Sequence, residues 1–84
     1  MRFPSIHLNG TSKRELISQL NEASHALNNA YSALKQAAPH GRDYYPQGPT
    51  ALETAITEHM DRLRRLDAIK EEIDAMTLTI DQID

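Results

Sequence analysis

Cysteine and tryptophan are absent from this 84-residue chain, which also contains only three glycines and one phenylalanine. Without cysteine, neither disulfides nor thiolate metal sites can add stability. No apolar run approaches the ~20 residues that a membrane-spanning helix needs, and residues 1–5 lack the apolar stretch of a secretory signal. We therefore expect a cytoplasmic protein that holds no metal ion or cofactor and does not associate with membranes.

A strong excess of charge of one sign is also lacking. Nine basic and twelve acidic residues give a formal net charge of -3. Proteins that bind duplex nucleic acid usually have a high isoelectric point or a basic face, and neither is evident in this sequence. Duplex nucleic acid is therefore excluded as the expected partner, while a small anionic ligand held by a few local charges remains open.

Residues 12–38 are predicted to form the first of two long helices. Ser12 and Glu15 have the spacing of a capping box, in which each side chain satisfies a free amide at the helix start. Pro39 cannot continue the helical hydrogen-bond ladder, so we expect the helix to end at about Ala38. Apolar residues recur at alternating spacings that are typical of helices packed at a shallow angle: Leu16, Leu20, Ala23, Leu27, Ala30, Leu34 and Ala37.

The residues before this helix, 1–10, are expected to form an extended arm. Pro4 and Gly10 disfavour a helix there, while Ile6 and Leu8 offer apolar anchors. The arm either forms a short strand or lies across a helix.

Residues 50–80 are predicted to form the second long helix. Thr50 and Glu53 have the spacing of another capping box. The apolar positions are Leu52, Ile56, Met60, Leu63, Leu66, Ile69, Ile73, Met76, Ile80 and Ile83. Steps of three between Met60 and Ile69 rotate the stripe around the helix. The apolar face is therefore broader than contact with a single helix requires. One part of it can face the first helix, and the rest can face a neighbouring subunit.

The whole chain, residues 1–84, is thus predicted to be one all-α domain, an antiparallel two-helix hairpin with an extended N-terminal arm. The acidic segment 71–84 would then lie beside Lys13 and Arg14. An isolated hairpin of this length rarely buries enough surface to offset chain entropy. We expect copies to assemble into an oligomeric helical bundle, a dimer or higher; the alternative is a monomer in which the arm is a third layer.

The connection at residues 39–49 is the main candidate site. It is longer than the ~2–8 residues usual between helices of a bundle. Tyrosine offers a stacking face and arginine a planar fork for phosphate or carboxylate, which suits a nucleotide-like ligand or a protein hot spot. The alternative is that the tyrosines cap the end of the bundle while the arginine forms an ion pair. The candidate ligand-binding residues in this loop are His40, Arg42, Asp43, Tyr44 and Tyr45.

A second candidate site is the start of the first helix. Asn9, Thr11 and Lys13 combine polar groups and a cation with free helix amides, which suits an anion. The alternative is that these residues cap the helix and pair with the acidic C-terminal segment. Within one hairpin this site lies far from the 39–49 loop, but an antiparallel dimer would allow the two to meet.

Two further polar groups have an ordinary interpretation. The row Asn21, His25, Asn28 and Ser32 either fixes helix register, lines a polar pocket or is solvated. The cluster Arg62, Arg64, Arg65 and Lys70 alternates with acids at spacings that allow ion pairs along the helix.

The histidines are scattered without metal-ligand spacing, and the chain has no nucleophile motif. We therefore expect no enzymatic activity.

The strings LNGTS at residues 8–12 and GRDYYPQG at residues 41–48 resemble a group of short bacteriophage and prophage proteins, and the likeness covers most of the chain. The resemblance implies a phage-encoded accessory protein acting in the cytoplasm of a bacterial host. In size, helical content and loop chemistry the chain is also similar to phage sponges such as the anti-CBASS family, which sequester nucleotide immune signals at subunit interfaces.

Two functions follow as expectations. In the first, the oligomer sequesters a small anionic, nucleotide-derived immune signal and so counters host defence, with Arg42 on phosphate, Tyr44 or Tyr45 stacked on a base, and Thr11 with Lys13 completing the site. In the second, the protein is an inhibitor or adaptor that docks on a host protein through the 39–49 loop or the second helix.

Overall fold

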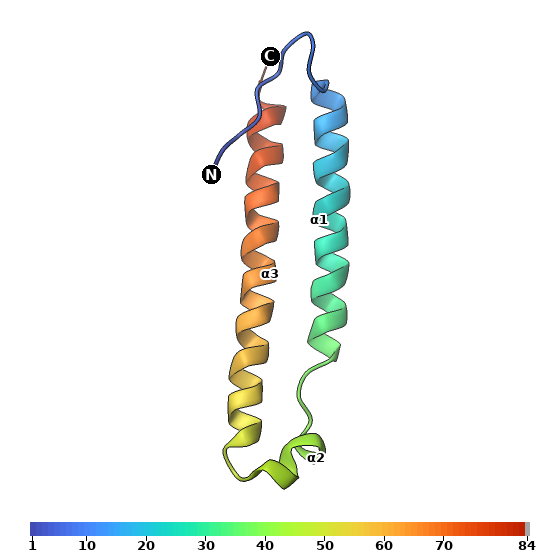
Figure 1. Ribbon diagram of the computed structural model, residues 1–84. Helices are drawn as coiled ribbons and strands as arrows, with labels where there is room; N and C mark the ends of the chain where they lie inside the picture. The colour runs from blue at the N-terminus through green and yellow to red at the C-terminus, as the bar shows by residue number, and fades with distance from the viewer. Residues whose placement is uncertain (84) are drawn as a thin grey trace.

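The computed structural model describes residues 1–83 as a helical hairpin (Figure 1). Helix α1 (Lys13–Gln36) and helix α3 (Ala51–Asp81) run side by side in opposite directions. The turn between them holds a short helix, α2 (Gly41–Tyr44), and a 3-10 turn, η1 (Tyr45–Gln47). The described residues contain no β-strand, so the predicted all-α hairpin is confirmed.

Helix α1 begins where the sequence predicts, with the Ser12 half of the predicted capping box. Ser12 has extended backbone, with φ -66° and ψ 156°, and its Oγ accepts a hydrogen bond from the Glu15 amide at 3.2 Å. The helix ends at Gln36, slightly before the predicted Ala38, where the Ala37 amide donates to the Leu34 carbonyl at 3.0 Å in a tighter turn.

The predicted side-chain cap at the start of α3 is wrong. Thr50 has near-helical backbone, with φ -99° and ψ -8°, and its side chain makes no capping hydrogen bond. A capping side chain reaches the following amides from extended backbone, which Thr50 does not have. The Thr54 hydroxyl instead donates to the Thr50 carbonyl at 3.2 Å.

The connection at residues 39–49 is more ordered than an open loop. His40 caps α2, because its Nδ1 accepts a hydrogen bond from the Arg42 amide at 3.2 Å. Gly48 follows η1 with φ 104°, a backbone conformation that strains residues with a side chain. The loop therefore has a defined shape, in which Tyr45 is exposed.

The predicted heptad seam of α1 is right for its leucines and wrong for its alanines. Leu20, Leu27 and Leu34 are half-buried, whereas Ala23, Ala30 and Ala37 are exposed. The half-buried positions that alternate with the leucines are Ile17, Ser24 and Tyr31. Both registers keep the same spacing, so the spacing alone could not separate them. The larger side chains of isoleucine and tyrosine remove more apolar surface from water than alanine does.

The seam of α3 carries polar residues within its apolar line. The three buried side chains among the described residues are His59, Leu63 and Ile80, at 5%, 6% and 0% exposure. The half-buried positions that continue the line are Leu66, Lys70, Ile73 and Thr77. Ile69 remains 44% exposed beside the seam, so part of the broad apolar stripe does not face α1.

The start of α1 and the residues that follow α3 are in contact. The Lys13 ammonium donates a hydrogen bond to the Ile83 carbonyl, so its contact is with backbone at the helix C-terminus, where the helix dipole favours a cation. In the N-terminal arm, Ile6 is half-buried as predicted, but Leu8 is 98% exposed and does not anchor the arm. Figure 1 shows the arm turning back over this end of the hairpin.

The hairpin exposes far more surface than a compact protein of its mass. Its solvent-accessible surface is 6588 Å², whereas a compact monomer of 9.5 kDa exposes about 5,000 Å². Its radius of gyration is 18.5 Å, compared with about 12 Å for a globular chain of this length. The two helices therefore leave much of their surface without a protein partner.

The buried imidazole of His59 gives a stability test. Its Nε2 is buried without a hydrogen-bond partner, and such a group costs ~1–3 kcal/mol. We expect His59→Leu to raise the free energy of unfolding by about 1 kcal/mol, measured by urea denaturation at fixed protein concentration. The neighbouring Leu63→Ala should lower it by ~2 kcal/mol or more. Equal losses in both variants would contradict this interpretation of His59.

Candidate functional site

The eight candidate binding residues lie in two groups at opposite ends of the hairpin. Asn9, Thr11 and Lys13 lie at the start of α1, and the other five lie around α2. The molecule measures 60 × 20 × 18 Å, so one hairpin does not bring the two groups together. Any site that combines them needs a second copy.

At the start of α1, the structure favours capping over anion binding. Ser12 caps the helix through its hydroxyl, and the Lys13 ammonium is already bonded to the Ile83 carbonyl. Asn9 and Thr11 are exposed. This arrangement resembles the alternative in which the segment caps the helix and pairs with the C-terminal segment. The partner of Lys13 is a backbone carbonyl, whereas the prediction had an acidic side chain.

At the other end, the two tyrosines differ sharply in exposure. Tyr45 is 85% exposed, whereas Tyr44 is half-buried. Arg42 and Asp43 are exposed, and within residues 1–83 neither forms an ion pair. The predicted alternative, in which Arg42 pairs with a carboxylate, is therefore not what the structure shows.

A hollow of about 710 Å³ lies beside the tyrosines. Its walls are the side chains of Tyr44, Tyr45, Pro46, Pro49 and Leu52, joined by two glycines. None of these residues is charged, and Arg42 is not among them. The stacking group and the phosphate-binding group of the sequence-based prediction therefore do not line the same hollow.

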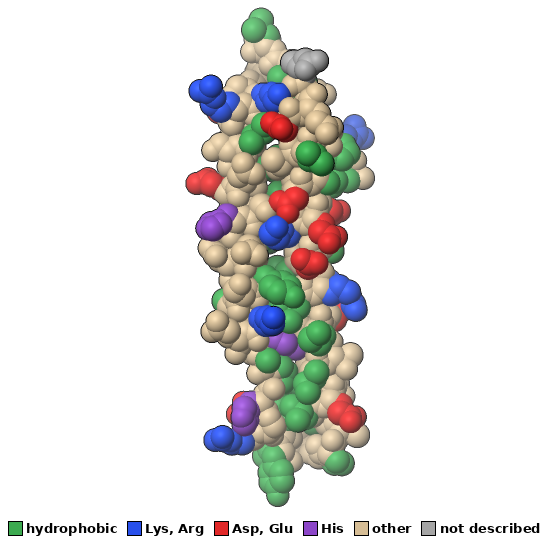
Figure 2. All heavy atoms as spheres, turned by 180° about the vertical axis from the view of Figure 1, so that it is seen from behind, with side chains coloured by type: hydrophobic (Ala, Val, Ile, Leu, Met, Phe, Trp, Pro, Cys, Tyr) green, Lys and Arg blue, Asp and Glu red, His purple; other side chains and the backbone are tan. Residues whose placement is uncertain are grey.

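This apolar surface continues along α3. Leu52, Ile56 and Met60 follow one another at intervals of one helical turn, and Ile56 and Met60 are 44% and 58% exposed. Figure 2 shows hydrophobic side chains gathered in the half of the hairpin next to α2, while most of the acidic side chains on this face lie in the other half. We call Tyr44, Tyr45, Pro46, Leu52, Ile56 and Met60 the tip surface.

A smaller polar cavity of about 270 Å³ adjoins the tip surface, and Tyr44 lines both. Asp43 from α2 and Glu58, His59 and Arg62 from α3 supply its polar groups. Arg62 lies 3.7 Å from the Glu58 carboxylate. The sequence pattern places neither Glu58 nor His59 at a site, and it assigns Arg62 to ion pairs along the helix. The one available signal was that His59 keeps the seam spacing to Leu63.

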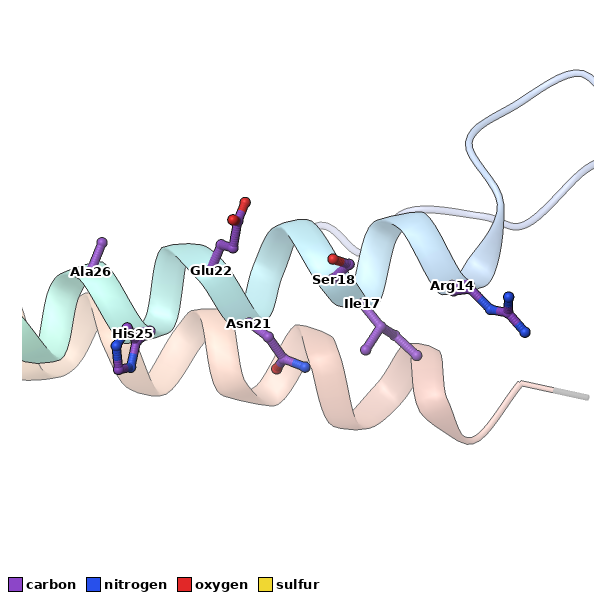
Figure 3. Close-up of a pocket in the computed structure, with 7 residues that line it drawn as sticks. All are labelled: Arg14, Ile17, Ser18, Asn21, Glu22, His25 and Ala26. Carbon is purple, nitrogen blue, oxygen red and sulfur yellow. The ribbon is translucent and has the colours of Figure 1, made fainter.

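The polar row of α1 is solvated. Asn21, His25, Asn28 and Ser32 are all exposed. Figure 3 shows Asn21 and His25 on one side of α1 and Ala26 on the other. The hollow drawn there, about 810 Å³, is lined by α1 alone. Because one convex helix cannot enclose a ligand, this feature is an open flank of the hairpin.

Next to this row, one polar contact joins the two long helices. The Ser24 hydroxyl donates to Asp74 Oδ1 at 2.6 Å, and the Lys70 ammonium donates to Asp74 Oδ2 at 2.8 Å. The hydrogen bond from Lys70, and then that from Ser24, lowers the pKa of Asp74. The hydrogen bond to Asp74 raises the pKa of Lys70.

The arginine cluster forms ion pairs along α3, as expected for a solvated face. Arg64 and Arg65 both contact Asp61, the latter at 3.0 Å. All of these side chains remain substantially exposed, so the pairs contribute little to stability.

Comparisons of the chain with protein-family models, with curated proteins and with solved structures find no match. Within the described residues, no helix has the length and apolarity needed to cross a bilayer. Residues 1–83 also contain no cluster of three or more histidine or acidic side chains placed to hold a metal ion. The function is therefore inferred from the surfaces of the hairpin.

The Asp74 contacts predict a pH dependence. Because the pKa of Asp74 is lowered in the folded state, its stabilising contribution is present above its unfolded pKa and is lost as the pH falls through the folded value. We expect Asp74→Asn to be less stable than the wild type at neutral pH and to lose less stability on acidification. Urea denaturation of both proteins between neutral pH and about pH 3 measures this. Parallel pH profiles would contradict it.

Proposed function

We propose that the protein is a non-catalytic binding protein that self-associates and docks on a second protein through the tip surface. The observation that carries the proposal is the exposure of Tyr45, at 85%, beside an uncharged hollow walled by proline, tyrosine and leucine. Contiguous exposed apolar surface of this kind marks interaction sites, and tyrosine is enriched among the residues that dominate protein interfaces.

The composition of the tip surface favours a protein over a nucleotide. A nucleotide needs a cation placed to meet its phosphates, but the tyrosine-lined hollow has none. The adjoining polar cavity holds two carboxylates, Asp43 and Glu58, beside Arg62, and these repel an anion. Lys13, the other predicted phosphate ligand, is bonded at the far end of the molecule.

The loop is also held in shape before any partner arrives. His40 caps α2, Gly48 makes the turn that follows η1, and Pro46 and Pro49 restrict the backbone. Binding therefore needs little additional ordering of this segment, which improves affinity.

The self-association that we propose agrees with the excess of exposed surface on a single hairpin. An oligomer also presents several tip surfaces at once, which strengthens binding to a partner that has more than one copy of its docking site. The resemblance to phage proteins makes a bacterial host protein the expected partner.

Site-specific photo-crosslinking in the bacterial host tests the docking. A benzophenone amino acid at position 45 should give a discrete adduct that contains a second protein. The same group at Ser32, which is also exposed but lies on the polar row of α1, should not. Once the crosslinked partner has been identified and purified, calorimetry measures its binding to this protein. We expect Tyr45→Ala to raise the dissociation constant by ~30-fold or more. No adduct, or equal adducts at both positions, would contradict docking through the tip.

Native mass spectrometry with a panel of nucleotide second messengers tests the ligand-sequestering alternative. We expect no added mass at micromolar nucleotide concentrations. If a nucleotide binds and both Arg42→Ala and Tyr44→Ala abolish the binding, the protein sequesters ligands and our proposal of protein docking is wrong.

A further inference from the structure

Helix α1 carries a lane of exposed residues without any charge. Its members keep heptad spacing along the helix: Leu16, Gln19, Ala23, Ala26, Ala30, Ala33 and Ala37. All except Leu16, which is half-buried, are exposed in the single hairpin. We call this set the alanine lane. The alanine lane lies along one edge of the seam with α3. The polar row lies along the opposite edge of the same seam.

Large apolar side chains of α3 lie on the same face of the hairpin. Ser24 and Lys70 line one hollow together with Asn21, His25 and Asn28 of the polar row. Both Ser24 and Lys70 donate a hydrogen bond to Asp74, which places Asp74 toward the polar-row side of the hairpin. Ile69 precedes Asp74 by five residues, which corresponds to a rotation of about 140° around the helix axis. Ile69 therefore lies on the side of the seam opposite Asp74. Met76, one heptad after Ile69, lies on that side too. Ile69 is 44% exposed and Met76 is half-buried, so the face opposite the polar row combines an alanine lane with projecting apolar side chains.

One hairpin leaves more surface uncovered than a typical protein interface takes from each partner. The hairpin exposes 6588 Å², about 1,500 Å² more than a compact monomer of its mass. A typical stable interface buries about 1,600 Å² in total, which is about 800 Å² from each partner, so the excess on one hairpin is large enough for an interface with a second copy. Packing two hairpins face to face would also give each long helix a second neighbour, as in a four-helix bundle.

We infer that a second copy of this chain covers the face formed by the alanine lane, Ile69 and Met76. This inference deepens the proposed self-association by assigning its surface. The face is suited to itself because it contains both small side chains, which let helices approach closely, and large ones that fill the space over them. The tip residue Met60 is two heptads from Asp74 and so lies toward the polar-row side, which leaves the tip surface accessible in the dimer.

Two substitutions on α1 separate this face from the rest of the helix. Ala30→Glu places a carboxylate in the alanine lane, and Ser32→Glu places one on the polar row; both positions are exposed in the single hairpin. A monomer would tolerate them equally. In the dimer, only Ala30→Glu buries a charge in the interface, so its dissociation constant should rise by ~30-fold or more.

Sedimentation velocity and light scattering of the full chain measure the outcome, with circular dichroism to verify helical content. We expect wild type and Ser32→Glu to have twice the monomer mass of 9.5 kDa, and Ala30→Glu to shift toward monomer. If Ser32→Glu dissociates the assembly while Ala30→Glu does not, the assigned face is wrong although self-association stands. A wild type that is monomeric at high micromolar concentration overturns both. Crosslinking at Tyr45 tests partner docking independently.

The lack of native cysteine allows a second measurement that does not depend on a destabilising charge. A single cysteine at position 30 should react with a maleimide more slowly than one at position 32 when the protein is concentrated. The two rates should converge on dilution, as the dimer dissociates. Equal rates at every concentration overturn the inference.

Discussion

Each long helix of this protein has one long neighbour, and the seam between α1 and α3 is the main tertiary contact of the hairpin. Three side chains are buried among the described residues, and all three are on α3. A hairpin with a single seam has a large surface for its volume, so the burial that offsets chain entropy is small. The exposed tip surface and the exposed alanine lane are both consequences of this one constraint.

The choice of residues in the seam decides what the outside of the hairpin can do. Ser24 and Tyr31 of α1 occupy positions that Ala23 and Ala30 could have filled, and the alanines therefore face outward. On α3 the seam takes up Lys70, while Ile69 stays 44% exposed. The seam tolerates polar groups that have hydrogen-bond partners. Ser24 is an example, because its hydroxyl donates a hydrogen bond to Asp74. His59 is the exception, with an unpartnered nitrogen. The hairpin thus keeps apolar surface available for contacts outside itself.

The fold could be predicted from the sequence because caps and periodicity are local signals. Ser12 and Pro39 bracket α1 nearly as expected, and the leucine positions of the seam were right. The register was not predictable, because two lines one residue apart share the same spacing and only the size of the facing side chains separates them. The cap at Thr50 failed because its sequence pattern does not fix its backbone conformation. At the candidate site, Tyr44 and Tyr45 were predicted as binding residues and both line one hollow, but the separation of Arg42 from that hollow depends on how α2 folds within the loop.

The dependence of thermal stability on protein concentration tests the central claim most directly. If association between hairpins supplies burial that one seam cannot, the midpoint of thermal unfolding should rise steadily over a ~100-fold increase in protein concentration, because association stabilises the folded state by mass action. A cooperative transition whose midpoint stays constant over that range would show that one seam suffices, and would contradict the account.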